Sequence, residues 1–380
     1  MKIAIFTDTY VPEVNGVAKT LKRFTDYLAK EKIEFKVFAP KSTGEDIFSN
    51  RVYSVKSFPF FLYPECRVAL PNVIQLRDEV KAFNPDIIHV TTPFNMGLSG
   101  LHIAKKLNIP IVGSYHTNFD KYLEYYDLQF LSDMLWKYMR WFHQSLRKVF
   151  VPSEDTLEQL REKGFNHLSI WPRGIDRSIF HENYDTKQIR QQYNIKEKYI
   201  LTYVGRIAKE KDVLLLPPIA ENLPSRIRNN VHWLIVGDGP IKDELEEIVP
   251  KNMTFTGFVD GTNLANIYAA SDLFVFPSPT ETFGNVVLEA LSCGTPVIGA
   301  NAGGVKSIVK NGMNGILCEE KDITDFVQAI DSLLTRDQTR KVMRENGIRY
   351  AQAQSWEKIF RNLLLEYEDV LAEQLLQELA

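Results

Sequence analysis

Cysteine and long apolar runs are the two features that this sequence has least of. Its three cysteines, Cys66, Cys293 and Cys318, are widely spaced among 380 residues and form no CxxC pair. This pattern argues against a disulfide framework or a zinc site and is typical of a reducing compartment. The apolar run near the N-terminus ends before Asp8, and no run approaches the roughly 20 residues of a membrane-spanning helix. We therefore expect a cytoplasmic protein, with any attachment to the inner face of the membrane being peripheral.

Two common ligand signatures are also absent, and the chain carries little net charge. The loop after the first apolar run, residues 7–16, is not a GxGxxG sequence, so the nicotinamide-dinucleotide fingerprint is missing there. No Asp-x-Asp motif occurs, and we expect no dedicated metal and no other cofactor. The formal net charge of −3 argues against general nucleic-acid binding, so we expect no nucleic-acid partner.

What the chain does have is a regular alternation of buried strands and helix-like segments. The pattern predicts strands at residues 2–6, 35–39, 85–90, 109–116, 149–151, 199–205, 231–236, 253–259, 271–276 and 296–300. Such alternation predicts doubly wound parallel sheets, an α/β fold. A turn-rich link at 170–180 divides it, so we predict two Rossmann-like domains facing each other across a cleft. They span residues 1–172 and 173–355, and the final helix, 356–380, joins the first domain and packs across the junction.

Residues 276–304 hold two glutamates within a βαβ pattern. Glu281 precedes the helix and Glu289 lies inside it. A rise of about 1.5 Å per residue separates them by on the order of 12 Å along the axis, too far for one acid–base pair at a single bond. The spacing suits two carboxylates that bind separate hydroxyl-bearing parts of one ligand, with a diphosphate at the helix N-terminus between them. The simpler interpretation is a capped helix with Glu281 exposed and Glu289 on its solvated face.

Two cations follow the first strand of the second half. Arg206 and Lys211 are five positions apart, just beyond the strand end. An arginine fork and a lysine point charge can neutralise a diphosphate there without a metal. Alternatively, both belong to an ordinary charged loop.

In the first half, polar residues and a glycine are predicted at the carboxyl ends of strands, where such sheets bind ligands. Tyr10, Gly16, His89, Thr91 and His116 occupy such positions. Gly16 opens a helix and allows a ligand to approach the backbone, although a lone glycine is commonly only a turn. His116 directly follows a strand and can face a cleft, whereas a lone histidine is commonly structural.

The segment 132–148 is predicted to be one amphipathic helix. Its apolar stripe is Leu135, Tyr138, Met139, Phe142 and Leu146, and its basic face is Lys137, Arg140, Arg147 and Lys148, flanked by Trp136 and Trp141. A basic, aromatic helix of this kind can lie on an anionic membrane surface. The alternative is a helix that packs on its own domain and exposes a solvated basic face.

Taken together, these features resemble the retaining nucleotide-sugar glycosyltransferases of family 4, which have the GT-B fold. The resemblance is carried, in order over residues 1 to about 356, by Gly16, residues 114–117, 172–176 and 204–211, and the E-x7-E pair Glu281 and Glu289. The first loop and the E-x7-E region look like those of lipid-directed members such as diacylglycerol glucosyl-, mannosyl- and sulfoquinovosyltransferases.

The resemblance implies a role for each matching position. Glu281 would contact the donor sugar and Glu289 the ribose hydroxyls, while His116 would touch the sugar near its 6-position. These roles make His116 and Glu281 the candidate catalytic residues. The implied donor-binding residues are Gly16, Arg206 and Lys211 for the phosphates, Gly257, Phe258 and Val259 for the base, Phe283, Gly284 and Asn285 for sugar and phosphate, and Glu289.

The function implied is a retaining, metal-independent transfer of a hexose from a UDP- or GDP-sugar to an acceptor hydroxyl, with a membrane lipid as one candidate acceptor. The departing phosphate would take the acceptor's proton, so no dedicated base is assigned. Two alternatives have the same architecture: a nucleotide-sugar epimerase and a non-catalytic nucleotide-sugar binder. Release of free nucleoside diphosphate would distinguish the transferase from both.

Overall fold

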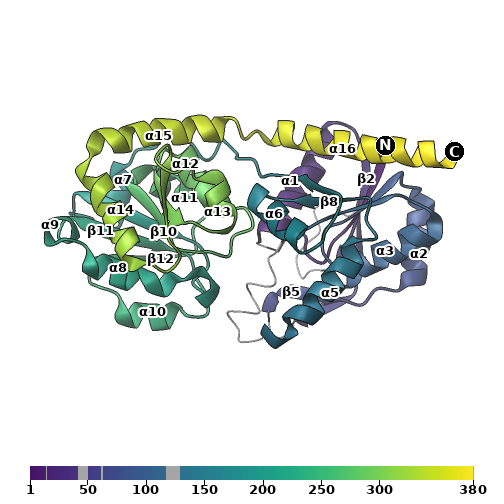
Figure 1. Ribbon diagram of the computed structural model, residues 1–380, viewed down its shortest axis with the longest axis horizontal. Coiled ribbons are helices and arrows are strands. Elements are labelled where there is room, and N and C mark those ends of the chain that lie inside the picture. Colours follow the sequence, from purple (N-terminus) through teal and green to yellow (C-terminus); the bar gives the residue numbers. More distant parts are fainter. Residues whose placement is uncertain (14, 42–49, 61–62, 117–128, 380) are drawn as a thin grey trace. The chain divides into compact units, whose positions relative to one another are not determined.

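The computed structural model describes residues 1–379 except 14, 42–49, 61–62 and 117–128 (Figure 1). The chain divides into two compact units. The described parts of residues 1–116, 130–172 and 357–379 form the first unit, and residues 173–356 form the second. Each unit is an α/β body in which helices surround a central sheet.

The first unit contains a seven-stranded sheet in the order β3-β2-β1-β6-β7-β8-β9. All its neighbouring strands pair in parallel. The strands are β1 (Lys2–Phe6), β2 (Glu34–Pro40), β3 (Val52–Val55), β6 (Ile87–Val90), β7 (Ile111–Ser114), β8 (Lys148–Val151) and β9 (Leu168–Ile170). A separate antiparallel pair is formed by β4 (Ser57–Phe60) and β5 (Tyr63–Ala69). The helices are α1 (Gly16–Lys30), α2 (Val73–Phe83), α3 (Asn95–Leu107), α5 (Ser132–His143), α6 (Glu154–Glu162) and α16 (Trp356–Leu379), and a 3₁₀ turn, Gln129–Leu131, precedes α5.

The second unit contains a six-stranded parallel sheet in the order β12-β11-β10-β13-β14-β15. Its strands are β10 (Tyr199–Val204), β11 (Val231–Val236), β12 (Met253–Gly257), β13 (Leu273–Phe276), β14 (Val297–Ala300) and β15 (Gly315–Cys318). Its helices are α7 (Lys187–Gln192), α8 (Leu216–Asn222), α9 (Ser225–Arg228), α10 (Lys242–Ile248), α11 (Gly261–Ala270), α12 (Asn285–Ser292), α13 (Gly303–Ile308), α14 (Ile323–Thr335) and α15 (Asp337–Gln352), with 3₁₀ turns at Lys209–Lys211 and Val213–Leu215. Strands β10, β11, β13 and β14 are buried at every residue, as expected for parallel strands covered on both faces.

The alternation of strands and helices predicted from the sequence is confirmed, and each unit is a Rossmann-like parallel sheet. The sequence reading missed β3, the β4–β5 pair, β9 and β15. These short strands lie at sheet edges or outside the main sheets, where few residues are buried on both faces. The apolar runs that mark the central strands are therefore weaker there.

Helix α16 is bound to the first unit through a buried polar network and through rings. The Tyr367 hydroxyl lies 2.6 Å from Nδ1 of His89, whose Nε2 lies 2.6 Å from the Ser114 hydroxyl. The ring of Phe360 packs on Phe24 at 5.2 Å. The network places His89 inside the core, so its predicted position beside a ligand is wrong.

Tyr10 is also misplaced by the sequence argument. Its side chain is buried, and its hydroxyl is 2.8 Å from that of Thr25 on α1. Tyr10 therefore belongs to the core, with its one polar atom satisfied by a neighbouring helix.

The predicted helix 132–148 ends early, at His143. Lys148 instead begins β8 and forms an ion pair with Glu366 on α16. Trp136, expected beside the basic face, is buried against the ring of Phe165. The predicted apolar stripe does face the protein, because Met139, Phe142 and Leu146 are buried.

Candidate functional site

The loop between β13 and α12 carries Glu281, and the backbone of this loop packs closely against two glycines, Gly303 and Gly304. The Gly304 amide donates to the Glu281 carbonyl at 2.6 Å. A Cβ on Gly303 would lie 2.4 Å from that carbonyl, and one on Gly304 would lie 2.3 Å from the Phe283 Cα. Side chains at these two positions would therefore push the loop away. The sequence argument did not assign them a role, although a Gly-Gly pair just after a buried strand is a signal for close backbone approach.

Glu281 and Lys211 form an ion pair, although 70 residues separate them in the chain. Lys211 Nζ lies 2.6 Å from Glu281 Oε1 and 3.3 Å from the hydroxyl of Thr280. Both charged side chains are mostly buried, where an ion pair is screened less than at the surface. The interpretation of Glu281 as merely an exposed helix cap is therefore wrong.

Arg206 lies on the same loop as Lys211, next to a buried carboxylate. Its guanidinium is 3.8 Å from Glu210, which is fully buried. The hydroxyl of Tyr203, in the core, donates to the Arg206 carbonyl at 3.0 Å. Burial raises the pKa of Tyr203 well above its usual value, and the negative charges of Glu281 and Glu210 raise it further. This loop differs from an ordinary solvated charged loop, because one of its carboxylates is completely enclosed.

Glycines also bring the loops after β10, β11 and β12 into contact. A Cβ on Gly237 would lie 1.9 Å from the Gly205 carbonyl, and one on Gly239 would lie 2.2 Å from the Ile207 carbonyl. The amide of Gly237 donates to the Gly257 carbonyl at 2.9 Å. The Arg206 loop is thus joined through residues 237–239 to the predicted base-binding residues. Residues 237–239 directly follow the predicted strand 231–236, but the sequence analysis assigned them no role.

The predicted base-binding residues form a turn with one exposed ring. Gly257 has a φ of +70°, and Val259 packs against the core. Phe258 between them is 63% exposed. An exposed aromatic ring on an anchored turn is available for stacking with a planar base.

Glu289 is on α12, as predicted, with its side chain half-buried. Tyr268 of α11, which is fully buried, donates from its hydroxyl to Glu289 Oε2 at 3.3 Å. At the start of α12, Gly284 has a φ of +96° and cannot cap the helix with a side chain, while Phe283 is buried and Asn285 is the first helical residue. The first-turn N–H groups of such a helix can bind an anion.

In the first unit, Gly16 is exposed at the start of α1. The Asn15 side chain caps this helix by accepting from the Ala18 amide at 2.9 Å. Asp8 performs a similar task for α3, accepting from the amide of Met96 at 3.0 Å. Burial raises the pKa of Asp8.

His116 follows β7 as predicted and is half-buried. Its ring packs against Trp171, with 5.6 Å between centroids. Of the segment 114–117 that carried part of the resemblance, Thr117 lies outside the described residues. The structure places Gly16 and His116 in the first unit and the other predicted site residues in the second.

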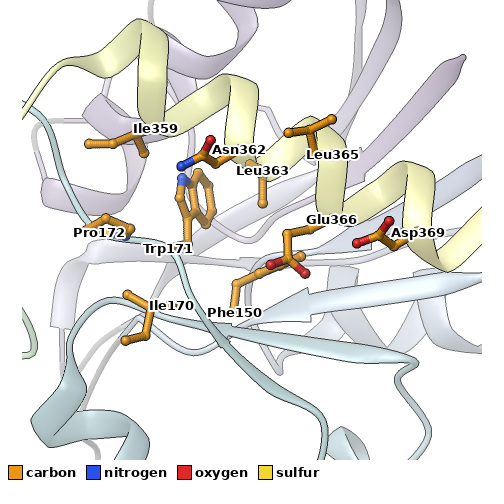
Figure 2. A pocket seen from close by; sticks show the side chains of 10 residues that line it. All are labelled: Phe150, Ile170, Trp171, Pro172, Ile359, Asn362, Leu363, Leu365, Glu366 and Asp369. Carbon is orange, nitrogen blue, oxygen red and sulfur yellow. The ribbon is translucent and has the colours of Figure 1, made fainter.

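Trp171 also lines a cavity of about 250 Å³ beneath α16 (Figure 2). Ile170, Pro172 and Leu363 surround its ring, and Asn362, Glu366 and Asp369 contribute the polar atoms. No residue that the sequence assigned to the site lines this cavity. The negative charge of its lining is reduced, because the Glu366 carboxylate is paired with Lys148.

The described residues were expected to hold no metal and to lack a membrane-spanning helix, and both features bear on the site. These residues contain no group of three or more His, Cys, Asp or Glu side chains arranged to hold a metal ion. Among the helices of the same residues, none has the length and apolar character required to cross a membrane.

Two family descriptions match the chain, one in each half. Residues 14–179 match "Glycosyltransferase Family 4", and residues 185–350 match "Glycosyl transferases group 1". Together they include every candidate site residue identified from the sequence.

The chain is also similar to curated proteins over most of its length. It is 30% identical to a GDP-mannose-dependent alpha-mannosyltransferase of Corynebacterium glutamicum, over 98% of this chain and 90% of that protein. It is 31% identical to an alpha-monoglucosyldiacylglycerol synthase of Streptococcus pneumoniae, over 83% of this chain and 75% of that protein.

Among solved structures, the sucrose-phosphate synthase of Thermosynechococcus elongatus has a similar fold. The TM-score is 0.79 at 21% identity, covering 98% of this chain and 99% of that one. The two parallel-sheet units, the two family matches and the curated relatives agree with the resemblance drawn from the sequence. The chain belongs to the family 4 glycosyltransferases, and its fold is GT-B.

Proposed function

We propose that this glycosyltransferase moves a hexose from a UDP- or GDP-sugar to an acceptor hydroxyl, with retention of anomeric configuration and without a metal. The observation that carries the proposal is the ion pair of Lys211 with Glu281, which lies shortly before the first residue of α12, with Arg206 on the same loop as Lys211. The mannosyltransferase relative is GDP-mannose-dependent, which favours a nucleotide sugar as the donor.

The chemistry follows from the charge that develops as the donor bond breaks. The departing nucleoside diphosphate gains negative charge on its outer phosphate. Arg206, Lys211 and the N-terminus of α12 stabilise that charge, and preorganised groups of this kind lower the barrier without reorganising during the step. The same two cations can supply the positive charge for which a metal is often used. The departing phosphate takes the proton of the acceptor hydroxyl, so no protein base is required.

Glu281 has two tasks in this scheme. Before the donor binds, it neutralises Lys211 through the 2.6 Å ion pair. When the diphosphate engages Lys211, the carboxylate turns to the hydroxyls of the donor sugar. Gly16 and His116, in the first unit, keep the roles that the family resemblance implies: Gly16 would contact the phosphates, and His116 the sugar near its 6-position.

The test is a donor screen on the full chain. Thermal-shift measurements with UDP, GDP and their hexose conjugates should show stabilisation by one nucleotide series, because a ligand that binds only the folded state raises its apparent stability. The matching sugar nucleotide with an acceptor should then release free nucleoside diphosphate. Equilibration of the sugar nucleotide without release would contradict transfer and favour the epimerase, while stabilisation with no chemistry would favour a binder.

We further propose a lipid acceptor and peripheral attachment to the inner face of the cytoplasmic membrane. The name of one relative, a monoglucosyldiacylglycerol synthase, supports the lipid class. An exposed stripe before and along α5 is the contact surface that we propose. Phe130, Met134 and Trp141 are 76%, 64% and 53% exposed, and Lys137 lies between them at helical spacing.

Vesicle sedimentation tests this attachment. Vesicles containing anionic lipid should sediment the protein at low salt and less of it at high salt, because salt screens the Lys137 contribution. Replacing Met134 and Trp141 by serine should reduce sedimentation at both salt concentrations. Equal recovery of this double variant and the unmodified protein would show that the stripe is not the contact surface.

A further inference from the structure

We propose that Tyr268 is a positioning residue of the donor site, which fixes the Glu289 carboxylate for the ribose hydroxyls of the nucleotide. The inference rests on the proposed function, because it takes Glu289 as the ribose ligand. It starts from one contact: the Tyr268 hydroxyl donates to Glu289 Oε2 at 3.3 Å, from the neighbouring helix α11.

Tyr268 is held rigidly enough to position another side chain. It is fully buried, and its ring packs edge-on against Phe274 of β13 at 5.6 Å and against Phe180 at 6.3 Å. Its carbonyl accepts from the Thr295 hydroxyl at 2.5 Å. Both the ring and the backbone of this residue are therefore fixed by the core of the second unit.

Glu289, in contrast, has a long and half-exposed side chain on α12. A glutamate loses several rotamers when it is ordered, and this loss opposes ligand binding. A hydrogen bond from a rigid phenol imposes much of that order before the ligand arrives, which is the general advantage of preorganisation. An ionised carboxylate accepts about four hydrogen bonds, so the bond from Tyr268 is compatible with two more from a ribose.

A purely structural explanation is that Glu289 only satisfies a buried hydroxyl. The second unit provides a control for this. Tyr199 is also buried, and its hydroxyl donates to the Leu334 carbonyl at 3.1 Å. It begins β10, whereas Arg206 follows the other end of that strand. Tyr199→Phe therefore removes a buried hydrogen bond of the same kind away from the donor site.

The experiment compares the binding of UDP and GDP with that of their 2′,3′-dideoxy counterparts by titration calorimetry. The dideoxy nucleotides lack both hydroxyls that Glu289 would bind. Tyr268→Phe should weaken binding of the ribonucleotide by about threefold to tenfold, the range for one ordinary hydrogen bond. It should leave the affinity for the dideoxynucleotide unchanged. The ratio of the two affinities, which measures the preference for ribose, should therefore fall. Tyr199→Phe should keep the preference of the unmodified protein.

Glu289→Asp serves as a second variant if Tyr268→Phe does not fold. It retains Tyr268 but withdraws the carboxylate by one methylene, and it should narrow the same preference. The inference is overturned if either variant keeps the full ribose preference, or if Tyr268→Phe weakens both nucleotides equally. It is also overturned if the unmodified protein binds a nucleoside diphosphate without preferring ribose. Failure of the unmodified protein to bind UDP or GDP at all would instead overturn the proposed function.

Discussion

Each unit encloses a polar network, and the two networks differ in formal charge. In the first unit, His89, Ser114 and Tyr367 form a network without formal charge. Burial lowers the pKa of His89 to about 3, so its imidazole is neutral at physiological pH. In the second unit, the buried or mostly buried groups include Glu210 and the Lys211–Glu281 pair, which are charged.

The difference separates structure from function. The neutral network satisfies its own hydrogen bonds and attaches α16 to β6 and β7, which stabilises the fold. The charged cluster is less favourable to bury, because taking ions out of water costs several kcal/mol even when they are paired. A fold has little reason to enclose these charges on a loop unless a ligand uses them. The comparison therefore predicts that changes in the first network affect stability, and changes in the second affect catalysis.

The largest effect should come from Glu281→Ala. We expect turnover to fall by on the order of 10²-fold or more, as for loss of a single preorganised group at a reacting centre. Binding of the nucleoside diphosphate should survive, because Lys211 loses its competing partner and remains available to phosphate. Donor turnover and calorimetry on the same preparation check both parts. Near-normal turnover would remove Glu281 from the catalytic residues.

The sequence predicted which residues form this cluster but not how they contact one another. Motif spacing was enough to predict four residues, because it places them on predictable elements: Arg206, Lys211, Glu281 and Glu289. The ion pair of Glu281 with Lys211 was not, because contacts between residues 70 positions apart depend on the strand order. Backbone contacts made by glycine were likewise invisible.

The first unit was harder to predict at the level of side chains. The amphipathic pattern of 132–148 gave the correct buried stripe, but it continued past His143, where the helix ends. His89 has the position of a ligand-facing residue in its strand, and only the packing of α16, which lies 278 residues away at Tyr367, identifies it as core. Periodicity identifies elements well and their partners poorly.

The next largest effect concerns nucleotide affinity. Arg206→Ala and Lys211→Ala should each weaken binding of the nucleoside diphosphate by roughly 1.5–3 kcal/mol, the range for a hydrogen bond to a charged group. Lys209→Ala is a matched control, because Lys209 is in the same 3₁₀ turn as Lys211 but is exposed. Calorimetry should find little change in that control. Equal losses of affinity in all three variants would contradict specific phosphate contacts, because a diffuse positive potential would then explain the binding.

Tyr367→Phe should affect stability rather than catalysis. It leaves Nδ1 of His89 buried without its partner, which should lower the free energy of unfolding by about 1–3 kcal/mol. Tyr27→Phe is the control. Tyr27, on α1, packs against Phe360 of α16, the helix that carries Tyr367, and its hydroxyl has no hydrogen-bond partner among the described residues. Urea unfolding measures both. A loss of turnover in Tyr367→Phe at unchanged stability would contradict the division between the two networks.

The last effect is a dependence of stability on pH that originates in the neutral network. The pKa of His89 is about 3 in the fold, below the 6.5 of an ordinary histidine. As pH falls below about 6.5, the unfolded chain binds a proton at this position and the folded protein does not, so the folded state loses stability until the pH nears 3. The loss is about 1.4 kcal/mol per pH unit for one such histidine.

Unfolding at pH 6.5 and pH 5 of the unmodified protein and of His89→Gln measures this contribution. Glutamine does not titrate, so the variant should lose less stability than the unmodified protein over this interval. His143, whose pKa burial lowers to about 4, contributes the same sign of slope in both proteins and cancels in the comparison. Identical slopes would mean that His89 is protonated in the fold. The network of the first unit would then carry a buried charge, as the cluster of the second unit does, and the contrast between the two networks would fail.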